Sequence, residues 1–390
     1  MINKKLTELS QVISTPAYVF DAEMFEKRAV LVQEAFGEKT GLCFSIKANP
    51  FLLSCLPKVF AKIEVCSPGE LTICEKVGAD MRTVIFSGVN KTQADVERAM
   101  KDNVGTFTAE SMLHLGLIQD EAVRTNKTVD VLLRLTGGSQ FGMDEEEVLQ
   151  IIRDRAEYSG IRIVGLHYFT GTQKRKIAAI EKELDYVESF LEKVEKEYGF
   201  RLERVEYGTG LAVDYFQPDA DIAEETRLRA VAPRIRALAE KVELTVEMGR
   251  FFAAPCGFYF TKIMDTKRNC GVNYAIVDGG LNQLKYDGQI QGMQIPVITH
   301  IGEDREVEAQ PWTLCGSLCT TADVLARNAQ FSDLKIDDVL VFHRTGAYSA
   351  MEGMSIFLSR EMPVIALLSP DGSLRILREH IYTDVFNSPV

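Results

Sequence analysis

The sequence has no excess of positive charge and no apolar run long enough to cross a membrane. It contains 44 Lys and Arg against 56 Asp and Glu, which gives a net charge of −12, whereas a nucleic-acid-binding protein would show a basic stripe. A transmembrane helix needs about 20 consecutive apolar residues. The N-terminal stretch MINKKLTELSQVISTPAY has neither the apolar segment nor the small-residue cleavage site of a secretory signal. We therefore expect a cytoplasmic protein with no nucleic acid and no membrane among its partners.

The cysteines do not form a metal-binding pattern. There are eight of them, and no CxxC pair or Cys/His cluster occurs, so none of the usual structural zinc motifs is present. The closest spacing, Cys315 and Cys319, lacks a second ligand pair. We expect free thiols in a reducing compartment and no metal site.

The middle of the chain alternates short β-rich runs with longer helical patterns. Several of the runs are apolar on both faces, which is typical of a buried parallel sheet. Eight βα units over roughly 220 residues match a (β/α)8 TIM-like barrel, whose typical size is about 250 residues. An open doubly wound sheet is the alternative, but no GxGxxG motif opens a helix after the first strand. The eight strands are expected at 43–47, 62–67, 83–88, 105–110, 131–135, 163–169, 204–208 and 244–249.

The clearest helix is expected at residues 174–198. Apolar residues recur there at alternating spacings of three and four, which places them on one helical face. Gly199 follows as a C-terminal stop. A similar helix is expected at 221–241.

After Phe251 the pattern changes to closely spaced strand-like runs, and SPDGSL is typical of a hairpin turn. The N-terminal run PAYVFDAEMF can add a strand to the same sheet. The predicted fold class is therefore α/β, with a barrel at 27–255. Segments 1–26 and 256–390 are predicted to form a second, β-rich domain.

Polar residues gather at the expected strand ends, where barrels of this kind carry their chemistry. Lys47, Glu64 and Arg134 lie at or near three of these ends. The last three strands end in HYFTGT (167–172), EYGTG (206–210) and EMGR (247–250).

These last loops predict a phosphorylated ligand. Gly208 and Gly210 let backbone N–H groups approach an anion closely, and Thr172 and Arg250 add a hydroxyl and a fork of donors. Together with Lys47 and a carboxylate at Glu247, they are the parts needed to hold pyridoxal 5'-phosphate. The lysine forms a Schiff base with the cofactor, and the carboxylate keeps the pyridine nitrogen protonated.

Eight motifs then follow one another in the order of a known family. They are FSIKANP, EVCSPGEL, QFGM, GLHYFTGTQ, EYGTGLAVDY, EMGR, CGSLCTTAD and GAYS. In this order they resemble the motifs of the pyridoxal-phosphate decarboxylases of the ornithine and diaminopimelate type, which share the alanine-racemase-like barrel. The resemblance covers nearly the whole chain. It implies an amino-acid decarboxylase that works as a homodimer with shared active sites.

The resemblance also implies roles for individual residues. Lys47 would bind the cofactor, Glu247 would pair with its pyridinium, and Cys319 would return a proton to the α-carbon after carbon dioxide leaves. In the family this cysteine reaches the site from the partner subunit of a head-to-tail dimer. The remaining cofactor-binding candidates are Glu64, Arg134, His167, Phe169, Thr172, Gly208, Thr209, Gly210, Gly249, Arg250 and Tyr348. The substrate-binding candidates are Thr320, Asp323, Lys285 and Tyr286.

Three departures from the family pattern concern the substrate and the cofactor ring. Phe169 stands where a histidine commonly stacks on the ring, and strand alternation is expected to turn the nearby His167 the other way. Thr320 follows Cys319, where the family has a glutamate or an aspartate that reads a distal amino group. Lys285 is the only basic side chain in DGGLNQLKYDGQIQGM, where an arginine-rich stretch would grip a distal carboxylate.

The TGTQ loop and the LCT sequence are similar to a side branch of the family, the butirosin-pathway type that decarboxylates glutamate attached to an acyl carrier protein. The first hypothesis is therefore α-decarboxylation of an amino acid, free or carrier-bound, without recognition of a charged distal amine. Diaminopimelate decarboxylase of lysine synthesis is the alternative. A non-catalytic regulatory homologue is the alternative from another class, although the retained Lys47, Glu247 and Cys319 argue against it. A racemase would need a catalytic tyrosine opposite Lys47.

Overall fold

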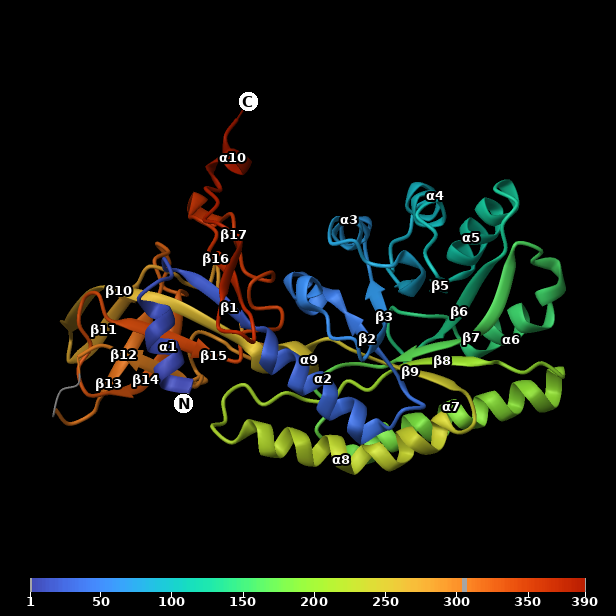
Figure 1. The fold of residues 1–390 in the computed structure, drawn as a ribbon, viewed down its shortest axis with the longest axis horizontal. Helices are drawn as coiled ribbons and strands as arrows, with labels where there is room; N and C mark the ends of the chain where they lie inside the picture. The colour runs from blue at the N-terminus through green and yellow to red at the C-terminus, as the bar shows by residue number, and fades with distance from the viewer. Residues whose placement is uncertain (1, 304–306, 390) are drawn as a thin grey trace. The chain divides into compact units, whose positions relative to one another are not determined.

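The computed structural model describes residues 2–303 and 307–389, which divide into two compact units (Figure 1). The first unit contains the residues up to Phe25, Asp214–Asp221 and the residues from Phe252 onward. The second unit contains Glu26–Val213 and Ile222–Phe251. The short stretch Asp214–Asp221, which lies inside the predicted barrel range, thus groups with the first unit.

The second unit is a closed barrel in which each strand pairs in parallel with the next, and the last strand pairs with the first. This confirms the predicted (β/α)8 fold. Each predicted strand is present, with ends displaced by at most two residues. The strands are β2 (Gly41–Ser45), β3 (Phe60–Val65), β4 (Val84–Phe86), β5 (Thr106–Ala109), β6 (Val129–Leu135), β7 (Ile161–Phe169), β8 (Arg204–Gly208) and β9 (Glu243–Met248).

The helices lie outside the strands of the barrel (Figure 1). The predicted helix at 174–198 is α7, which begins at Ile177 because the preceding residues form a loop. It buries one face and ends at Gly199, whose left-handed backbone (φ 59°) suits glycine. The helices are α2 (Ala22–Phe36), α3 (Pro68–Lys76), α4 (Gln93–Lys101), α5 (Met112–Arg124), α6 (Glu145–Arg153), α7 (Ile177–Tyr198), α8 (Ala220–Ala239) and α9 (Arg250–Ala253), with 3₁₀ turns at Ile46–Ala48, Pro50–Cys55, Met81–Thr83, Arg155–Glu157 and Ala254–Cys256.

The barrel interior changes from apolar to polar toward the carboxyl ends of the strands. An apolar cluster closes the interior and consists of Cys43, Ile85, Leu132 and Val164. Residues two apart on a strand face the same side, and two positions beyond three of these residues stand Ser45, Ser87 and Arg134. The alternation therefore builds a polar layer at the end of the barrel where the loops carry the candidate site.

The first unit is built on a nine-stranded sheet. The predicted N-terminal strand is present as β1 (Ala17–Asp21), which pairs antiparallel with β10 and parallel with β16. The SPDGSL hairpin joins β16 to β17. The other elements are β10 (Gly257–Asn269), β11 (Val272–Val277), β12 (Ile298–Ile301), β13 (Gln310–Cys315), β14 (Val324–Phe331), β15 (Val339–His343), β16 (Val364–Leu368), β17 (Leu374–Arg378), α1 (Ile2–Ser10), α10 (Asp384–Asn387) and the 3₁₀ turn Phe357–Ser359.

Two strands of this sheet, β13 and β14, were not predicted from the sequence. Pro311 lies within β13, and proline is a weak strand signal. In β14, Asn328 has a left-handed backbone (φ 56°), and the pairing with β13 shifts register. The shift breaks the alternation of buried and exposed residues that would have marked the strand.

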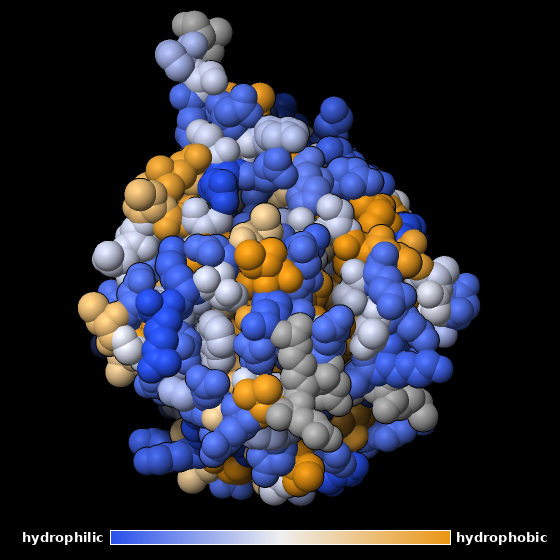
Figure 2. All heavy atoms as spheres, turned by 90° about the vertical axis from the view of Figure 1, so that its left-hand side faces the viewer, coloured by the Kyte–Doolittle hydropathy of each residue, from blue (hydrophilic) through white to orange (hydrophobic). Residues whose placement is uncertain are grey.

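Hydrophilic side chains predominate on the face that Figure 2 shows, with several separate hydrophobic patches between them. Within the described ranges, no helix is both long enough and apolar enough to pass through a bilayer.

Candidate active site

Lys47 lies just past the end of the first barrel strand. β2 ends at Ser45, and the chain enters a 3₁₀ turn, Ile46–Ala48, that carries the lysine. The side chain of Asn49 then accepts a hydrogen bond from the Phe51 N–H, and Pro50 begins the next turn. The predicted strand therefore stops two residues earlier than expected, because the Ala-Asn-Pro sequence favours turns over an extended strand.

Two carboxylates and a thiol surround the Lys47 amine. Its Nζ atom lies 2.8 and 3.0 Å from the two oxygens of Glu64 and 3.4 Å from Oε1 of Glu247. The Cys66 Sγ atom lies 3.6 Å from the same Nζ and donates to Glu64 at 2.9 Å. Burial and the Glu64 charge raise the pKa of the Cys66 thiol, so the thiol stays protonated.

Glu247 is a buried carboxylate that remains ionised. Burial alone would raise its pKa, but the Lys47 ammonium and the hydrogen bonds from His167 and Ser45 hold the pKa of Glu247 well below its usual range. The His167 Nε2 atom lies 2.9 Å from Oε2, and the Ser45 hydroxyl lies 2.9 Å from Oε1. Because an ionised carboxylate can only accept, the His167 proton is on Nε2.

The prediction that His167 turns away from the site was wrong. His167 and Phe169 are two residues apart on β7, so strand alternation places them on the same face. The His167 side chain is 2% exposed and contacts Glu247 inside the barrel. Phe169 lies at the end of the same strand, against Gly208.

A third carboxyl group, Glu206, lies wholly buried on β8. Burial raises its pKa well above the usual range, and the charges of Glu247 and Glu64 raise it further. Its ionised form is therefore disfavoured. The carboxylates that contact the Lys47 amine are Glu64 and Glu247.

The loops that follow β7 and β8 pair with each other. The Lys174 N–H donates to the Gly210 carbonyl at 2.8 Å, and the Ala212 N–H donates to the Lys174 carbonyl at 3.2 Å. Gly210 has a left-handed backbone (φ +62°), and a Cβ there would lie 2.0 Å from the Gly171 carbonyl oxygen. Only glycine fits this position, so the two loops can close on each other.

The other predicted phosphate residues lie on this end of the barrel. A Cβ at Gly208 would lie 2.4 Å from the Phe169 ring, and one at Gly249 would lie 2.7 Å from the Ala48 Cβ. Thr209 is buried and its hydroxyl accepts the Leu211 N–H at 3.3 Å. Thr172 is exposed, and Arg250 opens α9 and is partly buried.

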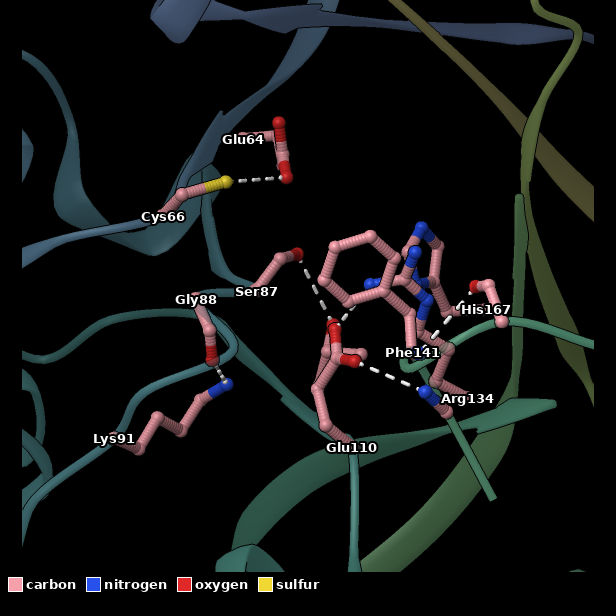
Figure 3. Close-up of polar contacts among 12 residues, drawn as sticks. Glu64, Cys66, Ser87, Gly88, Lys91, Glu110, Arg134, Phe141 and His167 are labelled. Carbon is pink, nitrogen blue, oxygen red and sulfur yellow. Dashed lines mark hydrogen bonds and ion pairs between the residues drawn. The ribbon is translucent and has the colours of Figure 1, made fainter. Parts of the chain in front are cut away.

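Arg134 is joined to a carboxylate that the sequence reasoning missed. Its Nη1 atom donates to Oε1 of Glu110, which follows β5 (Figure 3). The other Glu110 oxygen accepts the Gly142 N–H at 3.2 Å, and the Arg134 guanidinium lies 5.1 Å from the centroid of the Phe141 ring. Glu110 therefore ties the QFGM loop to β6. It stands at the end of a predicted strand, so the rule that selected Lys47 could have found it.

A second lysine, Lys91, is buried at the same end of the barrel. It is 4% exposed and donates to the Gly88 carbonyl (Figure 3). Its Nζ atom lies 5.2 Å from the centroid of the Phe86 ring. Burial lowers its pKa to about 8, although nearby Glu110 opposes the shift. No strand or helix pattern marks this residue as buried, because it lies in the loop after β4.

This low pKa predicts a pH-dependent stability. An unfolded lysine has a pKa of about 10.4, so between pH 8 and about 10.4 the unfolded chain binds a proton that folded Lys91 does not. Stability therefore rises with pH in this window, by about 3 kcal/mol at most. Urea unfolding of wild type and Lys91→Met at pH 7.5 and pH 10.5 checks this: the wild type should gain stability relative to the variant. Lys101→Met, which removes an exposed lysine of α4, is the control and should respond to pH as the wild type does. If the stability of Lys91→Met and of Lys101→Met changes equally with pH, Lys91 does not become neutral in the folded protein.

In the first unit, Cys319 lies exposed in the loop between β13 and β14, next to exposed Thr320. Asp323 closes this loop: its two oxygens accept the Leu281 and Leu318 N–H groups, each at 2.8 Å. The buried Asp323 carboxylate thus holds the cysteine loop in place, and its role toward the substrate stays a prediction.

The remaining substrate candidates also have partners in this unit. The Tyr286 hydroxyl is buried and donates to the His343 carbonyl at 2.6 Å, which indicates a packing role. Lys285 is half-exposed and forms an ion pair with Glu352 at 2.9 Å. Tyr348 is partly buried and has a left-handed backbone (φ 65°), which is rare for an aromatic residue and is typical of functional loops.

The groups in the barrel suit pyridoxal phosphate. Lys47 supplies an amine, and Glu247 supplies an ionised carboxylate for a pyridinium. The close contact between Gly171 and Gly210 forms a backbone cradle that a Cβ would fill. This donor set contains the parts that the cofactor needs. Among the described residues, no group of three His, Cys, Asp or Glu side chains is arranged to hold a metal ion.

Comparison with known proteins identifies the family. The model of the pyridoxal-dependent decarboxylases, pyridoxal binding domain, matches residues 22–254. Because this range is more than half of the chain, the chain belongs to the pyridoxal-dependent decarboxylases. It is an enzyme whose cofactor is pyridoxal phosphate. The family that its sequence motifs resemble is therefore confirmed.

Its relatives act on different substrates. The L-glutamyl-[BtrI acyl-carrier protein] decarboxylase of Niallia circulans is 26% identical, over 96% of this chain and 93% of its own length. The diaminopimelate decarboxylase of Aquifex aeolicus is 25% identical, over 98% and 93%. Among solved structures, the diaminopimelate decarboxylase of Methanocaldococcus jannaschii superposes with a TM-score of 0.85 at 25% identity, over 98% of this chain and 94% of that one.

Proposed function

We propose that this enzyme decarboxylates the α-carbon of an amino acid whose far end is neutral, such as one joined through that end to a carrier protein. The observation that carries the proposal is the loop around Cys319. Its sequence, CGSLCTTAD, contains a single carboxylate, Asp323, and that carboxylate accepts two backbone N–H groups. Thr320, beside the cysteine, offers only a hydroxyl. Recognition of a charged amine needs a carboxylate that reaches it, whereas Asp323 is directed at the backbone of its own loop.

The similarity to a carrier-bound glutamyl decarboxylase supports this substrate class. Diaminopimelate decarboxylase is the second candidate, favoured by the similarity in sequence and fold to several such enzymes. Both candidates use the same chemistry at the α-carbon and differ in how the far end of the substrate is bound.

The chain's own residues would divide the reaction as follows. Lys47 attaches the cofactor, and Glu64 fixes its side chain through two hydrogen bonds. Glu247 stays ionised and would pair with the pyridine nitrogen, and Phe169 would line the site beside the ring. When bound, pyridoxal phosphate withdraws electrons from the α-carbon as carbon dioxide leaves. Cys319 of a second copy in a homodimer then donates the proton to that carbon.

Carbon dioxide release across a panel of substrates tests the proposal. The panel contains meso-diaminopimelate, lysine, ornithine, free glutamate and glutamate loaded on a carrier protein. Loss of a charged partner in a buried site lowers kcat/KM on the order of 100-fold or more, so diaminopimelate, lysine and ornithine should be poor substrates. Turnover of diaminopimelate that equals or exceeds that of every other compound would favour the second candidate instead.

A variant with a carboxylate next to Cys319 tests the same point. Thr320→Glu should raise kcat/KM for diaminopimelate, while Thr321→Glu, at an exposed neighbouring position, should leave it unchanged. An equal response of the two variants would show that the position after Cys319 does not read the substrate.

A further inference from the structure

A mostly buried cation lies where the two glycine loops meet. Lys174 follows β7, and its backbone pairs with Gly210 and Ala212 of the loop after β8. The Lys174 Cε atom lies 3.2 Å from the position that a Cβ of Gly210 would occupy, so the side chain runs along the Gly210 backbone. The Nζ atom lies 6.0 Å from the centroid of the Phe169 ring. The ammonium is therefore held between the proposed phosphate loops and the aromatic ring at the end of β7.

Glu183 of α7 fixes this cation in place. Its Oε2 atom accepts hydrogen bonds from Lys174 Nζ and from the Tyr207 hydroxyl, each at 2.7 Å. The Thr170 hydroxyl donates to Oε1 of the same carboxylate. The side chains of Lys174 and Glu183 are 12% and 15% exposed, so water screens the pair only weakly.

Two explanations fit an ion pair in this position. The pair can simply fasten the 170–176 loop to α7. Alternatively, the carboxylate orients the ammonium for an anion that binds at the loops. A bound phosphate carries close to two negative charges, and a desolvated cation near it is worth more than one in water. The route of the lysine along Gly210, the residue that forms the cradle with Gly171, favours the second explanation.

We propose that Lys174 is a fixed cation of the phosphate site in addition to Arg250, with its ammonium offsetting the charge of the cofactor phosphate and Glu183 acting as its positioning residue. The inference rests on the proposed placement of the phosphate at the loops after β7 and β8. Lys174 belongs to one of these loops. Its ammonium therefore affects how tightly the phosphate binds and how it ionises, and not the chemistry at the α-carbon.

Variants of the full-length protein test this proposal. Affinity for pyridoxal phosphate is measured at two salt concentrations, and the ³¹P resonance of the bound cofactor is followed with pH. Lys174→Met should weaken the affinity 10- to 100-fold, reduce its salt dependence and shift the resonance, whereas Lys174→Arg should retain most of the affinity. Lys176→Met removes an exposed lysine two residues away and is the matched control, expected to be unchanged. Thermal unfolding of each variant verifies that it is folded.

Glu183→Gln separates the two explanations. If Lys174 serves the phosphate, this variant keeps the cation and should lose at most about 3-fold in affinity, far less than Lys174→Met. If the pair only fastens the loop, the two variants should weaken the affinity equally, and that result would overturn the proposal.

Thr172→Val separates failure of the inference from failure of its premise. A weaker affinity in Thr172→Val together with a wild-type affinity and ³¹P resonance in Lys174→Met would overturn the role of Lys174 and leave the phosphate placement intact. Wild-type affinity in both variants would overturn the placement as well.

Discussion

Lys47→Ala should lose the covalent attachment of pyridoxal phosphate and nearly all decarboxylase activity. Glu64 and Glu247 position the Lys47 amine, and alanine offers no nucleophile in its place. Removing a residue that forms the covalent intermediate lowers turnover on the order of 10⁴-fold or more. Reduction with borohydride, digestion and mass spectrometry should find the cofactor mass on the Lys47 peptide of the wild type and no such mass in the variant.

The control and the contradicting result both concern other lysines. Lys62→Ala removes a lysine nearer the start of β3 and should retain the label and the activity. Lys91 is a buried lysine at the same end of the barrel, and its pKa of about 8 leaves part of it neutral near neutral pH. If Lys47→Ala stays active and the label is found on the Lys91 peptide, the attachment site is Lys91 and not Lys47.

The barrel could be predicted from the sequence because its strands are short, apolar and regularly spaced. The positions of Lys47 and Glu247 followed from the same pattern, since chemistry in such a barrel lies at the carboxyl ends of its strands. Strand alternation was applied wrongly to His167: its separation of two residues from Phe169 places both rings on one face. The contact of His167 with Glu247 was therefore available from the sequence.

Other parts of the site depend on side-chain pairs that no repeating pattern in the sequence marks. Lys174 gains its partner from Glu183 of α7, and Asp323 gains the Leu281 N–H from another loop. No local pattern marks such pairs, because each side chain by itself is typical of a solvated surface. Glu110 is different. Its position after a strand was visible in the sequence, and only its pairing with Arg134 was not.

Glu247→Gln should lower kcat by about 100- to 1,000-fold while the protein still binds its cofactor. The carboxylate is ionised because Lys47, His167 and Ser45 all direct hydrogen bonds or positive charge at it. A glutamine has nearly the same size, but it is neutral and presents an NH₂ group to donors that need an acceptor. The variant therefore loses the negative charge that is proposed to keep the pyridine nitrogen protonated, and one of the three donors loses its partner.

The lowered pKa of Glu247 gives this variant a second signature. A carboxyl group whose pKa is lower in the folded state contributes stability above its unfolded pKa of about 4.3, and this contribution is lost as the pH falls through the folded value. The wild type should therefore lose more stability than Glu247→Gln when the pH is lowered from 5 to 2. Glu243→Gln, on the exposed start of the same strand, is the control and should match the wild type in kcat and in acid unfolding. Because the two signatures have one electrostatic cause, a variant that retained more than half of the wild-type kcat would show that this carboxylate does not serve the ring nitrogen, even if its acid unfolding changed as expected.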